Sequence, residues 1–129
     1  MKIEHLALWT ENIDALAAFY RDYFGATVGE EYANAAKGFR SRFLTFESGA
    51  RLEVMSTSRL SPLETPRGVQ RMGLTHFAMA TGSERRVDEL SARLAADGFE
   101  VLDGPRRTGD GYYESVVLDP DGNRIELTV

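Results

Sequence analysis

The stretch "LDPDGNRIELTV", residues 118–129, decides the fold, because "FESGARLEVMS", residues 46–56, repeats its pattern. When the glycines of the two stretches are aligned, Glu53 lies on Glu126, and each glutamate stands between two apolar residues. Similarity of this kind within one chain is typical of a duplicated structural unit. The sequence therefore predicts a protein made of two related halves.

A second match lies upstream of the first. The segment "HLALWT", residues 5–10, is similar to "HFAMAT", residues 76–81, so that His5 lies on His76. These are the only two histidines in the chain. The predicted organisation is a single domain over residues 1–129, with repeat 1 at 1–56, a linker at 57–72 and repeat 2 at 73–129.

Each repeat has the pattern of one strand, one helix and three further strands. Asn12 and Ser83 are expected to cap the helix N-termini, and Gly25 and Gly98 to end the helices in the left-handed conformation. Alternating apolar residues predict strands at 2–9, 26–32, 38–47 and 51–56 in repeat 1, and at 74–81, 99–106, 112–118 and 123–128 in repeat 2. The predicted class is α+β, with two βαβββ repeats.

Composition limits the chemistry. The chain has no cysteine, so any metal must be held by His, Asp or Glu. A net charge of −5 argues against a nucleic-acid partner, because phosphate binding needs concentrated positive charge. The N-terminal apolar run is too short for a signal segment or a membrane span, so we expect a soluble, cytoplasmic protein without a membrane partner. Linker residues Arg59, Arg67 and Arg71 are expected to be solvated, although they could instead cover a site for an anionic ligand.

Strand alternation predicts which way the histidines and glutamates point. Leu52 and Val54 are expected to face the helix of repeat 1, which turns Glu53 to the other face of the sheet. By the same rule four residues, two from each repeat, point away from their helices: His5, Glu53, His76 and Glu126. Two imidazoles and two carboxylates suit Ni²⁺, Co²⁺, Mn²⁺, Fe²⁺ or Zn²⁺. A single histidine of this kind is more often a polar-face or core residue, but the shared repeat position favours a metal site.

These features resemble the vicinal oxygen chelate superfamily, which includes glyoxalase I, bleomycin-resistance proteins, methylmalonyl-CoA epimerase and extradiol dioxygenases. The resemblance rests on the βαβββ repeat, the histidine that starts each repeat, and "LDPDGNRIEL" near the end of the chain. It implies a cup of curled sheets, and a homodimer whose sites lie within one chain or between subunits. The ligand set is most similar to that of glyoxalase I, a metal-dependent lactoylglutathione lyase.

The resemblance to glyoxalase I implies a lyase or isomerase reaction through a metal-stabilised enediolate. Glu126 would be the catalytic base and then acid, with Glu53 as the second candidate. Trp9 and Thr57 stand where bacterial glyoxalase I has an arginine and an asparagine that contact glutathione. These two departures put a glutathione adduct in doubt and leave the small-molecule substrate unassigned. The predicted substrate pocket contains Trp9, Phe43 and Met55.

Other functions on the same scaffold remain open at the level of sequence. A bleomycin-resistance type of protein would bind a small molecule without chemistry, but such binders usually lack the full ligand set. A dioxygenase or an epimerase would use the same cup, although these members usually lack a glutamate at the Glu53 position.

Overall fold

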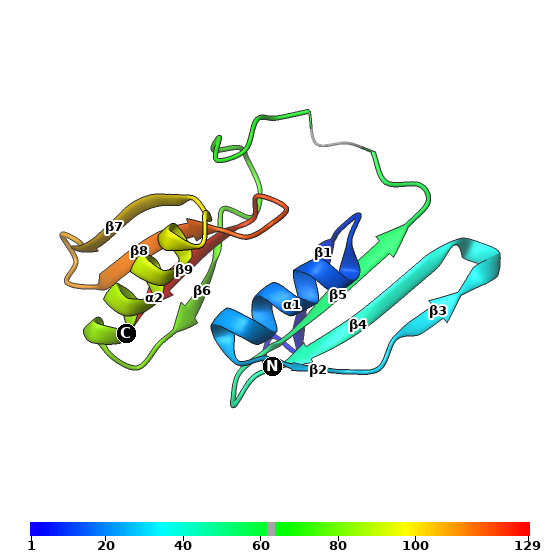
Figure 1. Cartoon of the computed structure of the whole chain (residues 1–129), viewed down its shortest axis with the longest axis horizontal. Helices are drawn as coiled ribbons and strands as arrows, with labels where there is room; N and C mark the ends of the chain where they lie inside the picture. Colours follow the sequence, from blue (N-terminus) through cyan, green and yellow to red (C-terminus); the bar gives the residue numbers. More distant parts are fainter. Residues whose placement is uncertain (62–63) are drawn as a thin grey trace. The chain divides into compact units, whose positions relative to one another are not determined.

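One sheet and one helix account for each half of the chain. The computed structural model describes residues 1–61 and 64–129, which divide into two units, Met1–Leu63 and Glu64–Val129. Unit 1 contains β1 (His5–Trp9), α1 (Ile13–Phe24), β2 (Thr27–Val28), β3 (Tyr32–Asn34), the 3-10 turn η1 (Ala35–Lys37), β4 (Phe39–Thr45) and β5 (Arg51–Thr57). Unit 2 contains β6 (Phe77–Ala80), α2 (Glu84–Ala96), β7 (Val101–Arg107), β8 (Tyr113–Leu118) and β9 (Arg124–Thr128). The predicted α+β class is confirmed (Figure 1). Pro62 and Leu63 of the predicted linker lie outside the described residues.

The two sheets have the same topology. Sheet order is β1-β5-β4-β2 in unit 1, with β3 also on β4, and β6-β9-β8-β7 in unit 2. In each unit the first strand runs parallel to the last, and the other pairs are antiparallel. Parallel pairing sets Ala7 opposite Glu53, and Ala78 opposite Glu126. The start of β1 is thereby brought near Glu53 on β5, and the start of β6 near Glu126 on β9.

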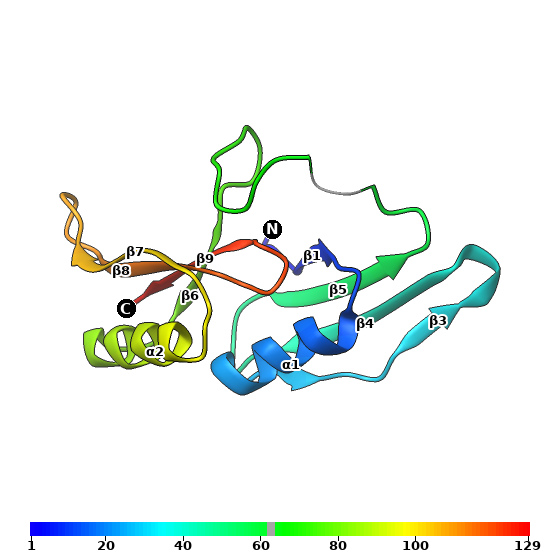
Figure 2. The same cartoon turned by 45° about the horizontal axis from the view of Figure 1, so that its top comes forward.

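The helices begin at the predicted caps. The Asn12 side chain accepts a hydrogen bond from the Ala15 N–H (3.0 Å), and the Ser83 hydroxyl accepts one from the Arg86 N–H (3.3 Å). Gly25 ends α1 with φ of 67°, in the left-handed region. Figure 2 shows each helix lying along one face of its own sheet. No helix among the described residues combines the length and hydropathy that a membrane crossing needs.

Apolar side chains fill the layer between each helix and its sheet. In unit 1 the buried set is Leu8, Ile13, Leu16, Ala17, Phe19, Tyr20, Ala26, Leu44, Leu52 and Val54. In unit 2 it is Phe77, Val87, Leu94, Val117, Leu118, Ile125 and Leu127. Burial of one such aliphatic or aromatic side chain stabilises the fold by about 1.5–3 kcal/mol. Leu52 and Val54 face the helix, as the alternation predicts.

The predicted strand at 26–32 is wrong in detail, because the chain there forms two short strands. Val28 lies opposite Leu44 and Tyr32 opposite Ser41, so residues 29–31 face only residues 42–43. The Gly29 N–H donates to the Phe43 carbonyl (2.8 Å), which continues the β2 register, so the extra residue lies at 30–31, opposite Arg42. The local apolar pattern does not record this shift, since it depends on the partner strand.

A buried carboxylate holds the turn between β8 and β9. Asp119 is fully buried and accepts hydrogen bonds from the N–H groups of Asp121 (3.0 Å) and Asn123 (2.8 Å) and from the Asn123 amide (2.9 Å). Arg67 donates to the carbonyls of Asp119 (2.9 Å) and Pro120 (2.8 Å). Arg67 is exposed, as expected for a linker arginine, and its guanidinium also bonds the backbone of this turn.

Candidate functional site

The sheet face opposite α1 carries the polar residues predicted for unit 1. On β5 the side chain of Glu53 retains 17% exposure, whereas Leu52 and Val54 on the helix side are buried. His5 starts β1, where strand alternation places it on the same face as Glu53. His5 Nε2 lies 3.9 Å from Glu53 Oε2. The structure therefore brings the first predicted histidine and glutamate together.

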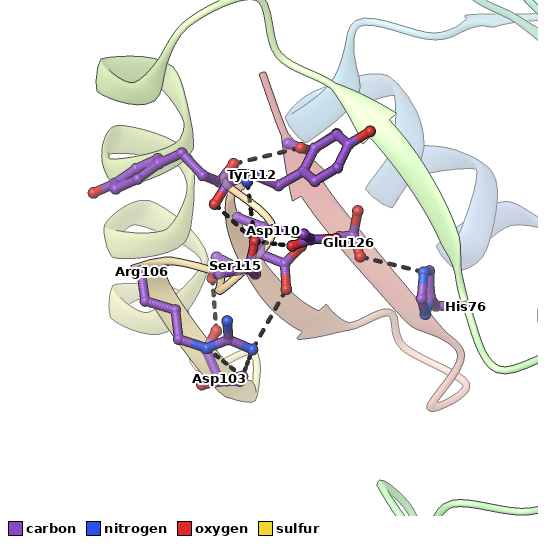
Figure 3. A network of polar contacts seen from close by, with 11 residues as sticks. His76, Asp103, Arg106, Asp110, Tyr112, Ser115 and Glu126 are labelled. Carbon is purple, nitrogen blue, oxygen red and sulfur yellow. Dashed lines mark hydrogen bonds and ion pairs between the residues drawn. The ribbon is translucent and has the colours of Figure 1, made fainter.

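The corresponding pair in unit 2 is closer. His76 immediately precedes β6, and its Nε2 lies 3.2 Å from Oε2 of Glu126 on β9. Figure 3 shows the two side chains pointing toward each other from neighbouring segments. Both glutamates have 17% of their side chain exposed and both histidines 39%, so a small molecule or an ion can reach each pair.

These separations suit donors to one metal ion. Imidazole nitrogen and carboxylate oxygen each bind a divalent transition metal at about 2.0–2.2 Å, so two donors of one ion are about 3–4 Å apart. The two pairs, at 3.9 and 3.2 Å, meet this condition without rearrangement. Within residues 1–61 and 64–129, no three His, Asp or Glu side chains gather as a metal-binding group. The four predicted ligands are thus seen as two pairs, one in each unit.

The predicted pocket residues share the sheet face of the His5–Glu53 pair. Phe43 on β4 lies opposite Glu53 in the strand register, and Trp9 lies opposite Met55. The Trp9 ring is half exposed and meets Phe39 edge-on, with ring centroids 6.2 Å apart. One side of the unit 1 pair is therefore aromatic and accessible.

Sequence reasoning did not identify a second glutamate, Glu114, on the corresponding face of unit 2. Glu114 on β8 lies opposite Thr128, which is two residues along β9 from Glu126. The Arg106 Nη2 atom lies 3.4 Å from the Glu114 carboxylate. Burial raises the pKa of the Glu114 carboxyl, the charge of Glu126 raises it further, and Arg106 opposes both effects. The alternation that identified Glu126 also applies to Glu114, because Ser115 and Val117 beside it are buried.

A β-bulge in β7 brings Arg106 to this carboxylate. Asp103 lies opposite Val116 and Arg106 opposite Glu114, with the register shifted between them, so both side chains reach the same face (Figure 3). Arg106 Nη2 donates to Asp103 Oδ2 at 2.5 Å. The shift spans Gly104 and Pro105, and a glycine or a proline inside a strand is a sequence signal for an irregularity of this kind.

Another carboxylate, that of Glu4, immediately precedes the first histidine. Its Oε2 lies 2.5 Å from His5 Nδ1, and Arg51 donates to its other oxygen. The hydrogen bond from His5 lowers the pKa of the Glu4 carboxyl; burial opposes this effect, and Arg51 adds to it.

Comparison with known proteins identifies the family. The model of the Glyoxalase/Bleomycin resistance protein/Dioxygenase superfamily matches residues 2–127. The chain belongs to this superfamily, which confirms the resemblance drawn from its repeats.

Individual relatives agree with this assignment. Protein PA2024 of Pseudomonas aeruginosa is 30% identical over 129 residues, which cover 98% of this chain and 86% of the relative. The structure of lactoylglutathione lyase from Agrobacterium tumefaciens matches with a TM-score of 0.68 at 26% identity, over 98% of this chain and 91% of the lyase. Glyoxalase I from Zea mays matches with a TM-score of 0.77 at 20% identity, over 98% of this chain, which spans 44% of that enzyme. The maize likeness shows a shared fold.

Proposed function

We propose that this protein is a metal-dependent, glyoxalase I-like lyase or isomerase that moves a proton between neighbouring carbons of a small oxygen-bearing substrate. The observation that carries the proposal is the pairing of a histidine with a glutamate at corresponding positions of both units, at 3.9 and 3.2 Å. The likeness to a lactoylglutathione lyase supports the same reaction class.

The proposed metal ligands are the two pairs together: His5, Glu53, His76 and Glu126. They would come together within one chain or between the subunits of a homodimer, and the same donor set results in both cases. A divalent metal bound there, of the Ni²⁺, Co²⁺, Zn²⁺, Mn²⁺ or Fe²⁺ class, would polarise two adjacent substrate oxygens and offset negative charge on them.

Glu126 is the proposed proton carrier. Its carboxylate would take the proton from the carbon beside the substrate carbonyl, leaving an enediolate, and return it to the neighbouring carbon. His76, 3.2 Å away, orients that carboxylate on the sheet face. Glu53 occupies the equivalent place in unit 1 and is the second candidate for this role.

The substrate is proposed to be something other than a glutathione adduct. Trp9 supplies a half-exposed indole at the position where a guanidinium would clamp a carboxylate, and an indole provides no such bidentate contact. Trp9, Phe43 and Met55 would instead hold an apolar part of the substrate beside the His5–Glu53 pair.

Turnover of hemithioacetals tests this function. Methylglyoxal is supplied with glutathione and, separately, with a small neutral thiol, with and without added Ni²⁺ or Zn²⁺, and thioester formation is followed. We expect a metal-dependent rate that favours the neutral thiol and falls by about 10²–10⁴-fold in Glu126→Gln. Glu47→Gln, which changes an exposed carboxylate in the matching turn of unit 1, should keep the wild-type rate.

Non-catalytic binding is the competing function, and the half-exposed Trp9 on the same sheet face as His5 favours it. It predicts saturable binding of small aromatic molecules, seen as quenching of the single tryptophan, without a metal-dependent rate for either thiol. Binding without a metal-dependent rate would contradict the enzymatic proposal and support non-catalytic binding.

A further inference from the structure

The imidazole of His5 has three side-chain neighbours in unit 1. Its Nδ1 lies 2.5 Å from Glu4 Oε2, its Nε2 faces Glu53 at 3.9 Å, and its ring meets Phe43 edge-on with centroids 5.5 Å apart. An ionised carboxylate can only accept hydrogen bonds, so Nδ1 is the donor in the short contact. In the neutral ring, the lone pair then lies on Nε2, which faces Glu53.

Glu4 is itself held in place. Arg51, opposite His5 in the pairing of β1 with β5, donates to the second carboxylate oxygen of Glu4. The guanidinium carbon of Arg51 lies 4.1 Å from the centre of the Phe43 ring, a cation–π distance. Each oxygen of Glu4 therefore has its own donor, and the chain from Phe43 through Arg51 and Glu4 ends on the imidazole.

Unit 2 lacks this arrangement. Aligning the repeats places Thr75 at the position of Glu4 and Val116 at that of Phe43. Arg124, at the position of Arg51, donates instead to the carbonyl of Gly68. The contacts around His5 are thus specific to the first repeat and are not imposed by the shared topology.

We propose that Glu4, held by Arg51, is a positioning residue that keeps the Nδ1–H tautomer of His5 and directs the Nε2 lone pair toward the Glu53 side. The ligand role of His5 rests on the proposed function, whereas the tautomer is a property of the metal-free chain. Carboxylates that bind the second ring nitrogen of a metal-binding histidine fix its orientation and raise its basicity. Glu4 would therefore set the metal affinity of the first histidine.

Long-range ¹H–¹⁵N NMR of the metal-free protein, above the usual pKa range of histidine, reports the tautomers of both histidines separately. Wild-type His5 should carry its proton on Nδ1. Glu4→Ala should give a mixture of tautomers at His5, and His76 should stay unchanged. Thr75→Ala, at the equivalent position of repeat 2, is the matched control and should leave His5 unchanged.

Zn²⁺ titration of the same variants provides the second readout. Glu4→Ala should weaken binding by about 10–100-fold and Thr75→Ala should leave it unchanged. An Nε2 proton on wild-type His5, or an unchanged tautomer in Glu4→Ala, would overturn the positioning role. If wild-type protein binds no metal, the proposed function fails, while the NMR comparison still decides whether Glu4 positions His5.

Discussion

At the scale of single residues, Glu114 offers a pH-dependent test of the unit 2 face. Its side chain is 14% exposed, and burial is the largest cause of its raised pKa. Between the ordinary and the raised pKa the folded state binds more protons than the unfolded state, so this carboxyl lowers stability as pH rises through that interval. Below the ordinary value the penalty is absent, since the group is protonated in both states.

Glu114→Gln removes this titration. The free energy of unfolding of the variant, relative to wild type, should therefore increase as pH rises from about 4 to 7. Urea denaturation at several pH values measures the difference, and Glu47→Gln, at an exposed carboxylate, should follow wild type. A relative stability that falls over this range would contradict the assigned environment of Glu114.

At the scale of elements, the turn from β8 into β9 fixes the start of the strand that carries Glu126. We expect Asp119→Ala to lower the free energy of unfolding by about 2–3 kcal/mol, because the donors that the buried carboxylate serves lose their partner. Chemical denaturation measures this loss. Glu47→Ala, in the matching turn of unit 1, should change it by less than about 0.5 kcal/mol. Equal effects of both substitutions would show that the turn does not depend on Asp119.

Local sequence predicts some of these elements and misses others for physical reasons. Alternation around Glu53 and Glu126 correctly predicts which face is buried, because each strand has one apolar side. The caps at Asn12 and Ser83 are read from local chemistry and are confirmed. The bulge that aligns Arg106 with Glu114 is marked locally only by Gly104 and Pro105, which indicate an irregular strand but not the residues that it aligns.

Contacts through space limit the prediction of the candidate site in the same way. The sequence predicts the residue types of both His–Glu pairs, because duplication repeats them. It does not predict that Arg51 holds Glu4 against His5, since this contact joins residues from β5 and from the segment before β1. Nor does it predict that Arg67 bonds the last turn, because a linker arginine usually faces water.

At the scale of the whole molecule, duplication supplies two similar sheets with different surroundings for the same pair of residue types. Unit 1 sets aromatic side chains beside its pair, whereas unit 2 sets Glu114 and Arg106 beside its own. Because the units differ in this way, the proposal assigns apolar substrate contacts to the first and proton transfer to the second.

Metal content of purified, Zn²⁺-reconstituted protein tests the central proposal most directly. If both pairs serve one ion, wild type should hold about one ion per chain, and His5→Ala and His76→Ala should each lose nearly all of it. Thr75→Ala, beside His76, should keep the full content. The proposal is contradicted if wild type binds no metal, or if each histidine substitution removes only its own half of the bound metal.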